Sequence, residues 1–149
     1  MRAVDANVLV RLIVRDDQRQ VAAAESFVAA GAWVSHLVLA ETVWVLDAVH
    51  QLPPARIATA IEMLLAHEAL TLQDADVVAL ALRHCRQGSA LGFSDCLVLE
   101  IARRAGHLPL GTFDRRLAGL PDAERPITPS TRGAPSAPRR PARASGRGT

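Results

Sequence analysis

The 149-residue chain contains no lysine, and all seventeen of its basic side chains are arginines. This absence excludes mechanisms that depend on a lysine beside a phosphorylated aspartate, such as those of receiver domains and haloacid-dehalogenase-like phosphatases. The chain also lacks the GxGxxG and GxxxxGK patterns of nucleotide-binding loops. We therefore expect neither phosphoaspartate chemistry nor a nucleotide-binding loop.

Aromatic residues and cysteines are also few. The aromatic residues number five and include no tyrosine: Phe27, Trp33, Trp44, Phe93 and Phe113. With so few stacking platforms we do not expect RNA binding by base stacking, and we predict that Trp33 and Trp44 lie in the core. Cys85 and Cys96 form no CxxC pair, which argues against a disulfide scaffold and favours two small core residues.

No uninterrupted apolar run reaches the roughly 20 residues that span a bilayer, and no secretory signal begins the chain. We expect a soluble cytoplasmic protein without a membrane segment. Residues 129–149 contain five arginines, no acid and no large apolar residue, so a disordered tail is predicted after a domain of residues 1–128. The tail is either a solvated extension or a basic segment that lengthens contact with nucleic acid.

Short strand patterns alternate with helical patterns along residues 1–128, which predicts an α/β fold with a parallel sheet. Strands are expected at 2–5, 32–35, 69–72, 108–113 and 125–128. Helices are expected at 6–14, 16–31, 36–52, 55–68, 74–88 and 91–106, with a short helix or turn at 114–120. Asn7 is placed to cap the first helix, and Ser35 the third.

Four acidic residues stand out from this pattern. Asp5 ends the first expected strand, Asp114 follows a later one and Asp95 opens a helix, while Glu41 lies in a long apolar run. Ligands of open α/β sheets bind at the carboxyl ends of the strands, so a shared acidic site is predicted there. The alternatives are that Asp95 and Asp114 only stabilise the positive ends of helices, that Asp5 is a turn residue after its strand and that Glu41 faces solvent.

Clustered carboxylates require a cation, because two of them about 4 Å apart repel by about 4 kcal/mol at an effective dielectric constant near 20. Carboxylate oxygens favour a hard metal, so Mg²⁺ is expected, with Mn²⁺ as the alternative. The five histidines lack the spacing of a metal site on one helix, and the chain has no HExxH pattern, which argues against zinc.

Four segments resemble the PIN-domain nucleases, and within them the VapC-type toxins of toxin–antitoxin systems. These segments are VDANVLVRLI, LAETVWVL, GFSDCLVLEIARRAG and GTFDRRLA, which contain Asp5, Glu41, Asp95 and Asp114 in this order. The resemblance implies a doubly wound parallel sheet of about five short strands with helices on both faces. It also implies a Mg²⁺-dependent endoribonuclease site of these four acids, support from Asn7 and Thr112, a cognate antitoxin and a homodimer.

A bound Mg²⁺ can activate water and stabilise charge on phosphoryl oxygens, and such hydrolysis leaves 5′-phosphate and 3′-hydroxyl ends. We predict that Asp5, Asp95 and Asp114 hold the metal and that Glu41 orients the attacking water or completes a second metal site. Candidate RNA contacts are Arg11, Arg115 and Arg116. Two other readings stay open: a non-catalytic PIN-like module that binds RNA or a partner, and an RNA-processing PIN nuclease outside a toxin–antitoxin system.

Overall fold

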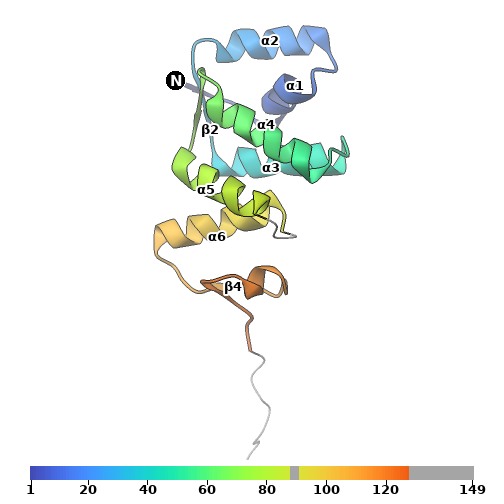
Figure 1. Cartoon of the computed structure of the whole chain (residues 1–149). Helices are drawn as coiled ribbons and strands as arrows, with labels where there is room; N and C mark the ends of the chain where they lie inside the picture. Colours follow the sequence, from blue (N-terminus) through green and yellow to red (C-terminus); the bar gives the residue numbers. More distant parts are fainter. Residues whose placement is uncertain (88–90, 128–149) are drawn as a thin grey trace, which may run out of the picture.

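The computed structural model describes residues 1–87 and 91–127 of the chain and has an α/β architecture with parallel strands and six α-helices, which confirms the predicted fold class (Figure 1). The α-helices are α1 (Ala6–Val14), α2 (Gln18–Val28), α3 (His36–Ala48), α4 (Pro54–Ala66), α5 (Ala75–Arg86) and α6 (Phe93–Ala105). The strands are β1 (Arg2–Ala3), β2 (Ala32–Val34), β3 (Leu70–Leu72), β4 (Leu110–Gly111) and β5 (Ala123–Glu124), and a short 3₁₀-helix η1 spans Leu117–Gly119. The predicted tail and the predicted helix end at Gly88 lie outside the described residues.

The first three strands form a parallel sheet in the order β1-β2-β3. Ala32 pairs with Arg2 on one side and with Leu70 on the other, so β2 is the central strand. Strands β2 and β3 both alternate buried, exposed, buried residues, which places one face of each strand against the core. Within the part of the chain that the structure describes, no helix combines the length and apolar character needed to cross a membrane.

The remaining two strands form a second parallel sheet, whereas one continuous sheet was expected. The backbone N–H of Leu110 donates to Asp122 O at 2.8 Å, and that of Thr112 donates to Glu124 O at 2.9 Å. The predicted strand at 125–128 is wrong for its described residues, since β5 ends at Glu124. Pro126 explains this end, because it has no N–H to donate to a strand ladder.

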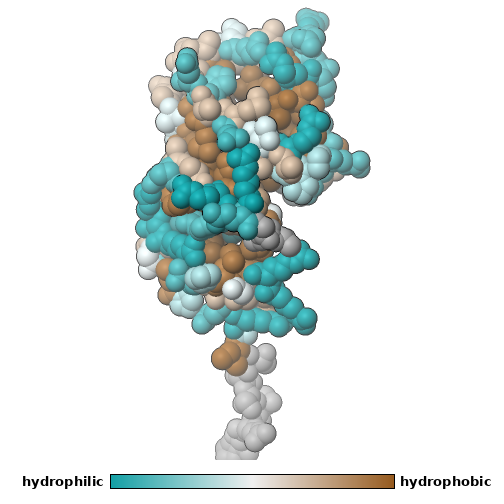
Figure 2. Space-filling view, in the orientation of Figure 1, coloured by the Kyte–Doolittle hydropathy of each residue, from teal (hydrophilic) through white to brown (hydrophobic). Residues whose placement is uncertain are grey.

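The core lies between the helices and the first sheet. Leu9, Leu39, Leu46, Ile61 and Leu99 are among its fully buried side chains, and they come from four different helices. Helix α5 packs along α6, and in Figure 1 β4 lies beyond α6, at the end of the molecule opposite α2. Figure 2 shows apolar side chains between hydrophilic ones on this face of the molecule.

Both tryptophans are exposed, so their predicted core positions are wrong. Trp33 is 39% exposed because it alternates with the buried Ala32 and Val34 along β2. Trp44 is 64% exposed because it lies three residues after the exposed Glu41, and residues three apart share one side of a helix. Cys96 is buried as predicted, and Cys85 is only partly buried.

Candidate functional site

Asp5 is the N-cap of α1. Its Oδ1 accepts a hydrogen bond from the backbone N–H of Val8 at 3.2 Å, which satisfies one of the unpaired amides at the helix start. Asn7, the expected cap, is instead an exposed residue of the first helical turn. The Asp5 side chain is exposed, and its Oδ2 makes no hydrogen bond to any other described residue. This oxygen is therefore available to an external ligand.

Glu41 lies on the solvent-exposed side of α3. The opposite side of the helix buries Leu39, Thr42, Val43 and Leu46. The apolar run around Glu41 thus packs into the core without enclosing the carboxylate, so the solvent-facing alternative describes its position correctly.

Asp95 lies in the first turn of α6 and is partly buried. The helix begins after Gly92, which has no side chain with which to cap it. A Cβ atom at Gly92 would lie 3.8 Å from Asp95 Oδ2, so the carboxylate sits close to the backbone of the helix start. The positive end of the helix dipole favours a negative charge there.

Thr112 and Asp114 are joined in a hydrogen-bonded turn that follows β4. The backbone N–H of Asp114 donates to Thr112 Oγ1 at 3.1 Å. Asp114 Oδ1 in turn accepts from the backbone N–H groups of Leu117 at 2.9 Å and Arg116 at 2.8 Å. These bonds, that of Leu117 first, lower the pKa of Asp114 below its ordinary value of 3.8, so the carboxylate is ionised at neutral pH.

The structure brings Thr112 and Asp114 together, but it does not assemble the four acids into a metal site. Among residues 1–87 and 91–127, no group of three or more histidine, cysteine, aspartate or glutamate side chains lies close enough to hold a metal ion. Asp5 follows β1 of the first sheet, whereas Asp114 follows β4 of the second. The donor chemistry suits Mg²⁺, whereas the observed arrangement does not fit a preassembled metal centre.

The three arginines expected to contact RNA differ in their surroundings. Arg11 Nη1 lies 2.5 Å from Asp16 Oδ1, and this ion pair neutralises its charge locally. Arg115 is exposed and has no ion pair with any described residue, while the backbone N–H of Arg116 belongs to the Asp114 turn. Arg115 is therefore the best placed of the three to meet a phosphate.

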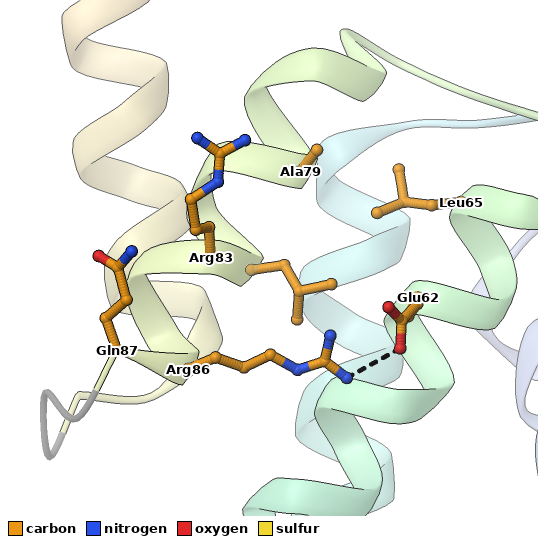
Figure 3. Close-up of a pocket in the computed structure, with 7 residues that line it drawn as sticks. Glu62, Leu65, Ala79, Arg83, Arg86 and Gln87 are labelled. Carbon is orange, nitrogen blue, oxygen red and sulfur yellow. Dashed lines mark hydrogen bonds and ion pairs between the residues drawn. The ribbon is translucent and has the colours of Figure 1, made fainter.

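Four arginines elsewhere in the described part of the chain are paired with acids: Arg15, Arg86, Arg103 and Arg104. Figure 3 shows a surface depression between α4 and α5 in which Arg86 bonds to Glu62 at 2.9 Å, beside Arg83 and Leu65. None of the four predicted acids lines this depression. It therefore contains none of the acids of the predicted site.

Sequence reasoning missed the buried carboxylate of Glu100 on α6. This side chain is 5% exposed and lies 2.8 Å from His84 Nδ1 on α5 and 2.6 Å from Arg103 Nη1. Arg103 also bonds to Asp122 Oδ2 at 2.9 Å and to Pro121 O at 2.8 Å. The signal in the sequence is the single acid in the apolar stretch CLVLEIA. The network fixes α6, which positions Asp95, against α5 and the loop before β5.

The parallel strands and the helices define an α/β protein. Its candidate site consists of acids after a strand and at helix starts, with a threonine in the turn of one of these acids. A comparison with protein families matches the PIN domain over residues 2–122, and the chain belongs to this family. PIN domains are generally metal-dependent nucleases. No curated protein and no solved structure gives a significant match to the chain.

Proposed function

We propose that the protein is a Mg²⁺-dependent endoribonuclease and the toxin component of a type II toxin–antitoxin pair. The observation that carries this proposal is the PIN-domain match over residues 2–122, which contains Asp5, Glu41, Asp95 and Asp114. Hydrolysis of a phosphodiester requires an activated water and stabilisation of negative charge on phosphoryl oxygens. Four acids in one nuclease domain are a ligand set of the type that this chemistry uses.

The proposed site residues differ in how far hydrogen bonds already fix their side chains. Asp114 is ionised and oriented, because two backbone amides hold its Oδ1 and Thr112 fixes the turn. Asp5 likewise has one oxygen held by an amide and the other available. Glu41 and Asn7 are exposed to solvent. The proposal requires at least three of these carboxylates to come within reach of one metal ion when the metal binds, an arrangement not found among the described residues.

A second candidate function follows from the absence of an assembled metal group among the described residues. In this alternative the protein is a PIN-like module that binds RNA or a protein partner without cleaving. The presence of all four acids disfavours it, because negative charge opposes binding of a polyanion. Dependence of product formation on metal separates the two functions.

The proposed partners are RNA, a cognate antitoxin and a second copy of the chain. Helix α3 supports a protein partner, since its apolar side chains Leu37 and Trp44 are exposed. Exposed apolar side chains that gather in a larger patch mark interaction surfaces.

The test is incubation of purified full-length protein with total cellular RNA, with Mg²⁺ or with EDTA, beside the variants Asp95→Asn and Asp47→Asn. Asp47 is a matched control, because it is an acid on α3 outside the proposed set. We expect discrete fragments with 5′-phosphate ends from the wild type and from Asp47→Asn, only with Mg²⁺, and none from Asp95→Asn with unchanged circular dichroism. Ends with 2′,3′-cyclic phosphate, or cleavage in EDTA, would refute the metal-dependent mechanism, and intact RNA would favour the binding module.

A further inference from the structure

Phe113 exposes its aromatic ring to solvent directly beside Asp114. The residue is 70% exposed, whereas Phe93 is buried at 3% and Phe27 is covered by the guanidinium of Arg2, 4.0 Å from the ring centroid. Phe113 is thus the one phenylalanine of the chain whose ring is left largely uncovered. Exposed apolar surface of this size has no stabilising role in the isolated domain.

The backbone around this ring is fixed before any ligand binds. On one side the N–H of Thr112 bonds to Glu124 O at 2.9 Å, and on the other side the N–H of Ala118 bonds to Asp114 O at 2.9 Å. Asp114 Oδ1 closes the turn through Leu117, whose side chain is buried. A preorganised turn lowers the entropy that binding must overcome, which favours a recognition role for the side chain it presents.

The surroundings of Phe113 favour a nucleic acid over a protein as the ligand. Its neighbours in the chain are the polar Thr112 and the acidic Asp114, and Arg115 is exposed without an ion pair to any described residue. A protein interface has an apolar centre, whereas an exposed ring with an exposed arginine two residues along the chain matches an unpaired base and its phosphate. Paired bases do not offer their faces to side chains, so the ligand is single-stranded.

We propose that Phe113 stacks on an unpaired RNA base next to the bond that is cleaved at Asp114, with Arg115 contacting the adjoining phosphate. This inference rests on the proposed nuclease function and adds the substrate class: single-stranded RNA segments or loops. Phe113 is a binding residue that sets which phosphate meets Asp114. This proposal departs from the expectation that RNA is not bound by base stacking.

The test measures binding of a fluorescein-labelled single-stranded RNA of twelve nucleotides by fluorescence anisotropy, in EDTA so that no cleavage occurs. Phe113→Ala and Phe113→Leu should weaken binding about 5- to 150-fold, which is the range for loss of one base–aromatic stack, and Phe113→Trp should restore it. Met63→Ala, at an exposed apolar residue of α4, is the matched control and should bind within twofold of the wild type. A fully paired RNA duplex should bind all variants equally.

Two results of the binding test would overturn the inference. In the first, Phe113→Leu binds as tightly as the wild type, which shows a general apolar contact without stacking. In the second, Phe113→Ala keeps its RNA affinity but changes the oligomeric state in size-exclusion chromatography, which assigns the ring to a contact between two copies of the chain. Circular dichroism confirms that each variant is folded.

Cleavage measured separately with Mg²⁺ distinguishes failure of this inference from failure of the proposed function. If the wild type cleaves and Phe113→Ala has an unchanged KM, the inference is wrong and the nuclease function stands. If RNA binding depends on Phe113 but the wild type cleaves nothing, the stacking contact stands and the nuclease function is wrong. A raised KM with little change in kcat supports both.

Discussion

Replacing Glu100 with alanine should destabilise the fold through the loss of two charged hydrogen bonds at the junction of α5 and α6. The carboxylate is 5% exposed and bonds to His84 and Arg103 at 2.8 and 2.6 Å. Breaking a fully buried ion pair costs about 3–5 kcal/mol when the remaining charge is left without a partner. Here Arg103 keeps Asp122 and Pro121 O as partners, and His84 is partly exposed, so we expect a smaller loss of about 2–3 kcal/mol.

The assay is urea unfolding followed by circular dichroism, with thermal unfolding beside it. The melting temperature of Glu100→Ala should fall by about 6–15 °C, given about 3–5 °C per kcal/mol for a domain of this size. Glu62→Ala removes an acid from the exposed pair with Arg86 and should change stability little, because solvent screens such pairs. Equal stabilities of Glu100→Ala and the wild type would refute the role given to this network.

Three further predictions follow from the site and the charge distribution. Asp5→Asn should keep the cap to Val8 and the wild-type stability but lose RNA cleavage, whereas Asp5→Ala should lose cleavage and about 1 kcal/mol of stability in urea unfolding. Because hydrogen bonds lower the folded-state pKa of Asp114, the ionised carboxylate stabilises the fold above pH 3.8, and this advantage over Asp114→Asn should vanish as the pH falls below that value in acid titrations. Deleting residues 129–149 should reduce the slope of log K against log salt for single-stranded RNA by up to about 3.5, one step of about 0.7 for each of the five arginines that meets a phosphate. An unchanged slope would show that residues 129–149 do not contact the RNA phosphates. Equal loss of stability in Asp5→Asn and Asp5→Ala would refute the capping role of Asp5.

The helices and their starts could be predicted from the sequence because the signals are local. Ser35 precedes an apolar run and caps α3 through a bond from the N–H of Val38 at 3.2 Å, as predicted. Pro53 and Pro54 mark the start of α4. Gly106 follows the last residue of α6 and has a positive φ, which glycine adopts easily at a helix end. The cap of α1 is Asp5 and not Asn7, since both are good capping residues and only the backbone geometry selects one.

Burial of single side chains was harder to predict, because it depends on how each element is rotated against its neighbours. Trp44 and Phe113 have the hydrophobicity of core residues, yet both are exposed. Glu100 has a charged side chain of the kind usually found at the surface, yet it is buried beside His84 and Arg103. His84 lies on a different helix from Glu100, so no spacing along the chain reveals this contact.

The sequence by itself determined the α/β class, because hydrophobic periodicity and capping residues act over a few positions along the chain. Its four motifs also carried the resemblance to the PIN family and the order of the four acids. Only the tertiary structure decided that the described strands form two sheets and that no group of three or more potential ligand residues is assembled to hold a metal ion among the described residues. It also decided that the ring of Phe113 faces solvent beside Asp114. Pairing of strands and assembly of a site depend on contacts between residues distant in the chain, and local sequence does not specify those contacts.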